Sequence, residues 1–352
     1  MDTMSKDLGV TDRARGALLG LAVGDALGTT YEFDAIEQRD LPTLATGPAN
    51  DVVGGGPFDL VAGQVTDDTQ LAVCLARSIA ERGGVQIADL AKRYVAWSEH
   101  AFDIGNQTRA AIDRLEAGEL ASSAGLDVWR ASERRPAGNG SLMRTAPIGV
   151  AFALRSDGLA SALIDGAIAD SLITHADPRC ALACAAFDAA IAAAIVGPLD
   201  GAAMGSTARA ALRTGTRRLR AAWAGNALDL EHLEQAALDL ETDLDAALTD
   251  QPGLYGNTLH LHRTAGFVRV AFRLAFWHAV HTRSWRDALV DVASRGGDAD
   301  TNAAIAGALL GARDGASAIP GAWIERVLAV TQPGPAVWAE AHHPRHMLAL
   351  VG

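Results

Sequence analysis

Cysteine is scarce in this chain of 352 residues, which holds only Cys74, Cys180 and Cys184. An odd, sparse set of thiols gives no disulfide framework and fits a reducing compartment. Positive charge is also in short supply, because the formal net charge is −12. A general electrostatic role on nucleic acid or on an anionic membrane is therefore not expected.

A hydrophobic signal-peptide core is lacking as well, since residues 2–7 are mostly polar. The most apolar stretch, residues 181–199, is rich in alanine and is interrupted by Asp188. We interpret it as a buried helix and not as a membrane span. Together with the few thiols, these features predict a cytoplasmic protein with no membrane partner.

The motifs of several enzyme classes are missing. The sequence contains no His-Glu-x-x-His, no Walker-A loop, no Gly-x-Ser-x-Gly and no Cys-x-x-Cys. The three histidines that crowd the C-terminus, His342, His343 and His346, are expected at the surface and are not assigned to a metal.

Alanine and helical periodicity are abundant, whereas alternation with a period of two is scarce. Apolar residues after position 69 follow one helix face, and Gly83-Gly84 is expected to end that helix. Helices are also expected over residues 303–312 and 267–281. The sequence predicts an all-α protein in which residues 1–352 form one domain, with residues 201–262 as a peripheral helical insertion.

Residues 16–20 and residues 307–311 share the sequence Gly-Ala-Leu-Leu-Gly. Small residues four positions apart leave a flat helix face, so that two helices can approach closely. We expect a tightly packed central pair of helices, one from each end of the chain.

Two short acidic motifs lie near these helices. The side chains that could bind a metal are Thr66, Asp67, Asp68, Asp298, Asp300 and Thr301. Four carboxylates brought together repel one another unless cations neutralise them, and two divalent ions would balance their charge. Oxygen ligands of this kind suit Mg²⁺, Mn²⁺ or Ca²⁺. Capping of a helix N-terminus explains either motif alone, but the pairing of two such motifs favours a metal site.

Two further carboxylates stand near the end of the first helix. Asp25 lies between apolar residues, and we interpret it as a structural carboxylate that is hydrogen-bonded to backbone. Glu32 comes just before a long segment, residues 34–63, that is rich in glycine and proline and is expected to be a loop. If this loop covers the metals, Glu32 is the candidate general base or gate ligand.

A glycine-flanked turn at residues 138–144 could bring backbone N–H groups close to an anion. Arg144 could add positive charge there. His175 comes just before a helix start at Pro178, where a histidine is more often a structural hydrogen-bonding group than a ligand.

Five segments in this order resemble the ADP-ribosylglycohydrolases, which include the dinitrogenase-reductase-activating glycohydrolase and the ADP-ribosylarginine hydrolases. The matching segments are residues 20–33, 66–69, 138–144, 174–178 and 296–301. The resemblance implies an all-helical domain with two Mg²⁺ or Mn²⁺ ions held by the six metal-binding candidates. It also implies that Glu32 is a mobile-loop carboxylate near the metals, with catalytic roles for Glu32, Asp67 and Asp68.

The resemblance further implies residues that hold ADP-ribose, which are Gly138, Asn139, Gly140, Ser141, Met143 and His175. Tyr255, in a later loop, is a candidate to stack on the base, although no motif anchors it. One departure concerns Pro136, because members of the dinitrogenase-reductase type can carry an Asp at that position. If an acid is needed there, Glu32 or Asp67 would have to supply it.

The function implied is metal-dependent removal of ADP-ribose from a target, with ADP-ribosylarginine on protein as the first choice and a small molecule as another substrate class. Water would attack C1″ of the ribose. Two alternatives stay open: a protein that binds ADP-ribose or a toxin without hydrolysis, and a two-metal phosphoesterase.

Overall fold

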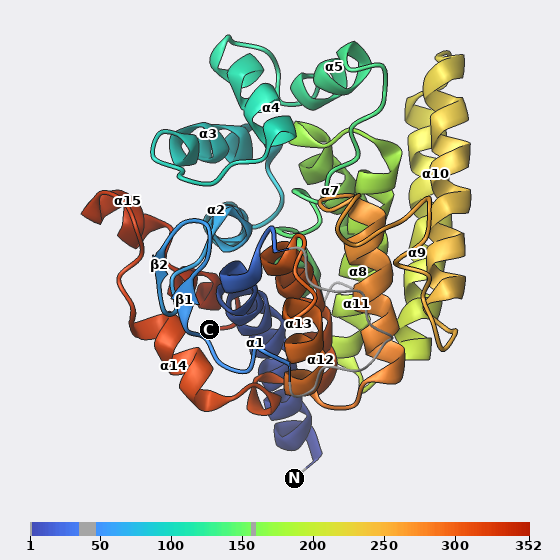
Figure 1. Cartoon of the computed structure of the whole chain (residues 1–352). Coiled ribbons are helices and arrows are strands. Elements are labelled where there is room, and N and C mark those ends of the chain that lie inside the picture. The colour runs from blue at the N-terminus through green and yellow to red at the C-terminus, as the bar shows by residue number, and fades with distance from the viewer. Residues whose placement is uncertain (1, 35–46, 156–159) are drawn as a thin grey trace.

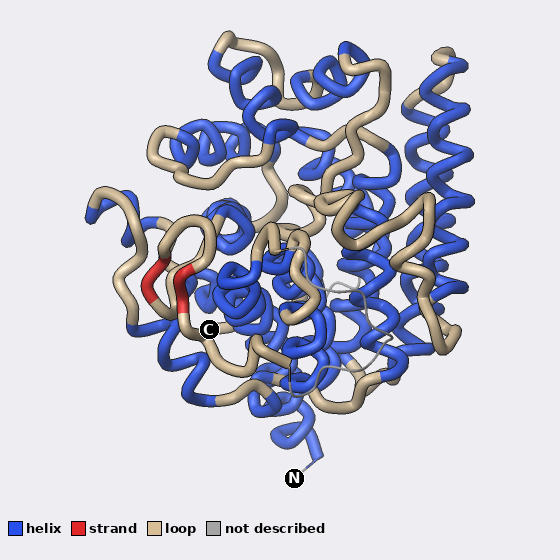
Figure 2. The backbone as a smooth tube through the Cα atoms, viewed as in Figure 1, coloured by secondary structure: helices blue, strands red, loops and turns tan. Residues whose placement is uncertain are grey.

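The computed structural model describes residues 2–34, 47–155 and 160–352. These residues form an almost entirely helical molecule, with one short β-hairpin at its edge (Figures 1 and 2). The predicted all-α class is confirmed.

The helices follow one another along the whole chain. Their bounds are α1 Asp2–Gly28, α2 Asp67–Arg82, α3 Ile87–Ser98, α4 Asn106–Glu116, α5 Ala124–Ala131, α6 Ala146–Ala153, α7 Ala160–Thr174, α8 Pro178–Val196, α9 Gly201–Ala222, α10 Ala227–Ala246, α11 Val268–His281, α12 Trp285–Ala293, α13 Ala299–Asp314, α14 Gly321–Ala329 and α15 Ala336–Ala341. The short 3₁₀ helices are η1 Thr29–Tyr31, η2 Ala316–Ala318 and η3 Pro344–Leu350, and the hairpin pairs β1 Gly54–Gly55 with β2 Leu60–Val61.

Helices α1 and α13 form the central pair, side by side in the middle of Figure 1. A Cβ atom added to Gly20 would lie 2.1 Å from the carbonyl oxygen of Gly307, and one added to Gly16 would lie 2.2 Å from that of Gly311. Only glycine allows the two backbones to come this close. The predicted packing of the two repeated segments is confirmed, and it joins the two ends of the chain.

The other helices surround this pair. Helices α2, α8, α11 and α12 contact α13, while α9 and α10 pack against α8 at one edge of the molecule (Figure 1). Asp243 of α10 receives hydrogen bonds from Arg269 and Arg273 of α11, which fastens the helices of the 201–262 segment to the body. The assignment of this segment as an insertion in a single domain stays a prediction.

By length and composition, α8 is the one helix in the described residues that could cross a membrane. Of its most apolar stretch, 72% is buried inside the protein, as in a core helix. The interpretation of residues 181–199 as a buried helix agrees with this, although the helix begins at Pro178 and ends at Val196.

Local predictions had mixed outcomes. Helix α2 ends at Arg82, directly before Gly83, which has a φ of 76° and terminates the helix as expected. The expected loop over residues 34–63 contains the β1–β2 hairpin, and its residues 35–46 lie outside the described part of the chain. The expectation that the C-terminal histidines lie at the surface was wrong for His342 and His343, which are 9% and 1% exposed, because aromatic and backbone contacts of the last turns cover them.

Candidate functional site

Both acidic motifs lie at helix starts. Helix α2 begins directly after Thr66, and α13 begins directly after Asp298. Neither residue caps its helix with a side-chain hydrogen bond. The polar side chains are directed to other partners, so capping does not account for them.

Asp25 of α1 sets the position of the first motif. Its buried carboxylate accepts hydrogen bonds from the backbone N–H groups of Thr66 and Thr69, at 3.0 and 3.2 Å, and from both hydroxyls. The predicted structural role of Asp25 is confirmed. Burial raises its pKa to about 6, although the four hydrogen bonds act in the opposite direction.

The second motif meets the end of the first helix. One carboxylate oxygen each from Glu32, Asp298 and Asp300 lies within 4.8 Å of the others. The Glu32 Oε2 atom is buried and has no hydrogen-bond partner. Two backbone hydrogen bonds hold this arrangement, from Phe33 N to the Gly297 oxygen at 2.7 Å and from Gly297 N to the Asp34 oxygen at 2.9 Å.

Asp68 joins the two motifs. Its Oδ2 atom accepts a hydrogen bond from the Thr301 hydroxyl at 3.3 Å and lies 3.1 Å from the Thr66 hydroxyl, whose single hydrogen it shares with Asp25. The Thr66 hydroxyl also lies 3.4 Å from Asp300 Oδ2. The Asp68 Oδ1 atom is buried without a partner. The structure thus brings the predicted metal-binding side chains of both ends together.

Within the described part of the chain, no basic group is paired with the carboxylates of this cluster. Burial, with repulsion from Asp300 and other carboxylates, raises the pKa of Glu32 to about 11. The same causes raise the pKa values of Asp67, Asp68 and Asp300 well above the usual range, and burial also raises that of Asp298. The partnerless oxygens and the hard oxygen donors fit divalent cations, which would neutralise these carboxylates.

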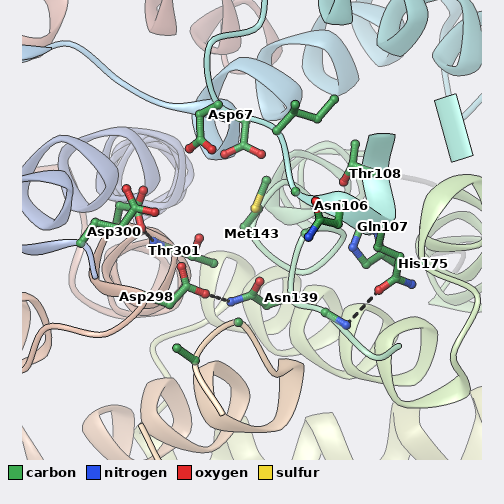
Figure 3. Close-up of a pocket in the computed structure, with 18 of the residues that line it drawn as sticks. Asp67, Asn106, Gln107, Thr108, Asn139, Met143, His175, Asp298, Asp300 and Thr301 are labelled. Carbon is green, nitrogen blue, oxygen red and sulfur yellow. Dashed lines mark hydrogen bonds between the residues drawn. The ribbon is translucent and has the colours of Figure 1, made fainter. Parts of the chain in front are cut away.

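A cavity of about 450 Å³ opens over the cluster. Asp67, Asp298, Asp300 and Thr301 lie on one side of it, and Met143 lies between them and His175 (Figure 3). The glycine turn also lines the cavity, with Asn139 next to Asp298 (Figure 3). The acidic cluster and the glycine turn therefore border one volume.

Hydrogen bonds hold the glycine turn against α4, the segment before α11 and the acidic cluster. Gly138 N donates to Gln107 Oε1 at 3.1 Å, and Asn139 N donates to the Gly266 oxygen at 2.9 Å. The Asn139 amide donates to Asp298 Oδ2 at 2.6 Å (Figure 3). Gly140 has no room for a side chain, because a Cβ atom there would lie 2.8 Å from His175 Cε1. The turn is therefore fixed relative to the acidic cluster.

Some of the predicted site residues do not line the cavity. Ser141 is fully buried and accepts a hydrogen bond from Ser171. Tyr255 accepts one from Arg295 at 3.0 Å and packs edge-on against His260 and His262. Neither residue is part of the cavity wall, so a contact of either with a ligand stays a prediction.

Sequence reasoning missed Asp103, which lies in the cavity wall before α4. Its carboxyl group shares a hydrogen bond with Asp67. Asp103 thus adds an acid beside the first motif, and the residue that stands in for the acid missing at Pro136 stays a prediction. The signal was weak, because a single Asp before Ile104 and Gly105 matches no spacing rule.

Three polar residues at the start of α4 were also missed. Asn106, Gln107 and Thr108 line the cavity between Asp103 and His175. In the sequence they resemble an ordinary helix start, and only the packing of α4 over the glycine turn places them at the site.

Fold and site together define an all-helical protein with a buried carboxylate centre beside a ligand cavity. A sequence model of the ADP-ribosylglycohydrolase family matches residues 6–343. The chain therefore belongs to the ADP-ribosylglycohydrolase family, which supports a hydrolase activity.

Individual proteins agree with this assignment. The chain is 32% identical to an ADP-ribosylarginine hydrolase, Tri1, of Pseudomonas putida, over 90% of this chain and 74% of that protein. It is 29% identical to the ADP-ribosyl-[dinitrogen reductase] glycohydrolase of Rhodospirillum rubrum, over 90% and 91% of the two chains. A solved structure named ADP-ribosylglycohydrolase-related protein complex superposes with a TM-score of 0.65 at 27% identity, covering 97% of this chain and 98% of that one.

Proposed function

We propose that this protein removes ADP-ribose from ADP-ribosylated arginine on a protein by hydrolysis at C1″ of the ribose. The observation that carries the proposal is that the acidic cluster and the glycine turn line one cavity. A sugar with vicinal hydroxyls fits the acidic cluster, and a diphosphate fits the glycine turn. Two relatives that are named ADP-ribosylarginine hydrolase support arginine as the linked residue.

The six metal-binding candidates would hold two Mg²⁺ or Mn²⁺ ions, with Glu32 beside them. Bound divalent cations would supply positive charge that neutralises the carboxylates and would polarise ribose hydroxyls and water. Asp25 keeps Thr66 and Asp68 in place for this task, and the Asn139 amide orients Asp298.

The chain's own groups would direct the reaction. Water adds to C1″ as the bond from C1″ to the guanidino nitrogen breaks, through an oxocarbenium-like transition state. The guanidino nitrogen leaves with the electron pair of that bond, and the proton that the water loses restores the guanidinium of free arginine. Asp103 lies at the cavity wall and is hydrogen-bonded to Asp67, so it is placed to take the proton of the water, and Glu32 is the other candidate. His175 and the glycine turn would hold the diphosphate, the turn through backbone amides other than those of Gly138 and Asn139, which donate to Gln107 and Gly266.

The test is incubation with an ADP-ribosylated arginine peptide, with and without Mg²⁺, followed by mass spectrometry. Release of intact ADP-ribose and unmodified arginine is the expected result. Binding in a fixed ratio without product would instead support a binding protein, and a nucleotide or phosphate fragment would support a two-metal phosphoesterase. A panel with serine and small-molecule linkages would then identify the preferred bond.

A further inference from the structure

Arg144 lies beneath the glycine turn and outside the cavity wall. Its side chain is fully buried, and its guanidinium lies 4.6 Å from the centre of the Tyr94 ring. Arg144 Nε donates to Asp170 Oδ2 at 3.1 Å, and Asp170 Oδ1 accepts a hydrogen bond from Tyr94 at 2.6 Å. The charge of Arg144 is thus balanced by Asp170 within the core, and the cation is not offered to a ligand.

Arg144 Nη2 donates to the backbone oxygen of Asp170 at 3.1 Å, whereas Nη1 is directed toward the site. Arg144 Nη1 donates to the Gly140 oxygen at 3.1 Å and to the Thr174 hydroxyl at 3.0 Å. The Thr174 hydroxyl in turn lies 2.8 Å from Nδ1 of His175. A continuous chain of hydrogen bonds therefore runs from a buried cation to the ring of His175.

The chemistry of the donors determines which group donates in each of these hydrogen bonds. Arg144 can only donate, so the Thr174 oxygen accepts from it and keeps its own hydrogen for another partner. Among the described residues, His175 Nδ1 is the only acceptor that this hydroxyl contacts. A hydrogen on Nδ1 would leave the buried hydroxyl without an acceptor, which is unfavourable. The imidazole must then carry its hydrogen on Nε2.

The Nε2 atom faces the glycine turn. Cβ atoms added to Gly138 and Gly140 would lie 3.4 and 2.9 Å from it, and His175 lines the cavity (Figure 3). Burial and the nearby charge of Arg144 lower the pKa of His175 to about 3, so the ring is neutral at working pH. A neutral ring with one defined donor suits an oxygen acceptor such as a phosphate.

We infer that Arg144 and Thr174 are positioning residues that hold His175 as an Nε2–H donor for the ligand at the glycine turn. The identity of that ligand as the diphosphate of ADP-ribose rests on the proposed function, whereas the tautomer does not. Arg144 also fixes the turn itself through the Gly140 oxygen, so one buried cation orients both groups that face the ligand.

The tautomer is tested by long-range ¹H–¹⁵N NMR of the full chain labelled at histidine, without ligand. The His175 signals are assigned by their loss in His175→Gln. We expect an unprotonated Nδ1 and a protonated Nε2 from pH 5 to pH 8. An Nδ1–H ring, or a ring that exchanges between both forms, would overturn the inference even if the protein proved to bind no ADP-ribose.

Because variants of the buried Arg144 risk unfolding the core, the test changes Thr174 instead. Thr174→Val keeps the shape of the side chain and removes its hydroxyl. The valine variant should lose the fixed tautomer of His175 and bind ADP-ribose about tenfold more weakly. Its KM should rise and its kcat should stay nearly unchanged. Thr174→Ser keeps the hydroxyl and should restore the tautomer and the affinity. A buried threonine away from the site, Thr216 of α9, provides the control variant Thr216→Val. A valine variant with the tautomer and the affinity of the unmodified protein would contradict the proposed positioning.

Discussion

At the residue scale, Asp67 and Asp68 occupy different environments although they are neighbours in sequence. Asp67 faces the cavity and Asp103, whereas Asp68 lies beneath it between the hydroxyls of Thr66 and Thr301. Each adds a carboxylate that burial makes costly to charge, and cations would remove that cost.

The double variant Asp67→Ala/Asp68→Ala should keep its helical circular dichroism and lose the release of ADP-ribose by more than about a hundredfold. Removing two like charges from a crowded cluster does not threaten the helices, because Asp25 still holds Thr66 and Thr69. Undiminished turnover with Mg²⁺ present would refute the metal assignment.

Asp103→Asn preserves the size of the side chain and removes its ability to take a proton. We expect kcat to fall by about 10²- to 10⁴-fold with little change in KM, as for loss of a general base. The control is Asp113→Asn on the exposed face of α4, ten residues along the same segment. If Asp103→Asn retained full kcat while Glu32→Gln lost it, the proton would be assigned to Glu32.

Single residues also mark the limit of sequence reasoning. The metal-binding candidates were found because two Asp and a Thr recur at each end of the chain, and the structure brings them together. Asp103 was missed because one acid in a loop carries no pattern, and its relation to Asp67 exists only once α4 has folded over the site.

At the scale of elements, the site depends on how closely α1 and α13 approach. Asp25 and Glu32 come from α1 and the turn after it, while Asp298 and Asp300 flank the start of α13. A change in the separation of these helices would therefore move one half of the cluster away from the other.

Gly20→Ala should lower the free energy of unfolding by about 3 kcal/mol or more and should also reduce activity. The added methyl group would lie 2.1 Å from the Gly307 oxygen, so the helices would have to separate. Chemical denaturation measures the effect. Gly205→Ala is the matched control, because nothing lies within 4 Å of a Cβ there. That change should stabilise the protein by up to about 1 kcal/mol. Equal stability of the two variants would contradict the close approach.

At the scale of the whole molecule, the acidic cluster couples metal binding to folding. It unites residues from both ends of the chain, and these residues are far apart in an unfolded chain. Cations that bind the folded state alone therefore stabilise it, by about 2.7 kcal/mol at a hundred times the dissociation constant.

Mg²⁺ or Mn²⁺ should raise Tm by several degrees in differential scanning calorimetry, and a chelator should reverse the shift. The same titration of Asp67→Ala/Asp68→Ala should give a much smaller shift. A melting temperature that neither cation changes at saturating concentration would refute a divalent centre at this cluster.

The sequence by itself determined the helical class, the close contact of its two repeated glycine segments and the candidates at both acidic motifs. These features are local or periodic, so they can be read from neighbouring residues. Tertiary structure alone decided that Asp103 faces Asp67, that Ser141 and Tyr255 stand outside the cavity wall, and that Arg144 acts on His175 through Thr174. Those relations join side chains from different helices and loops, and packing in three dimensions sets their distances.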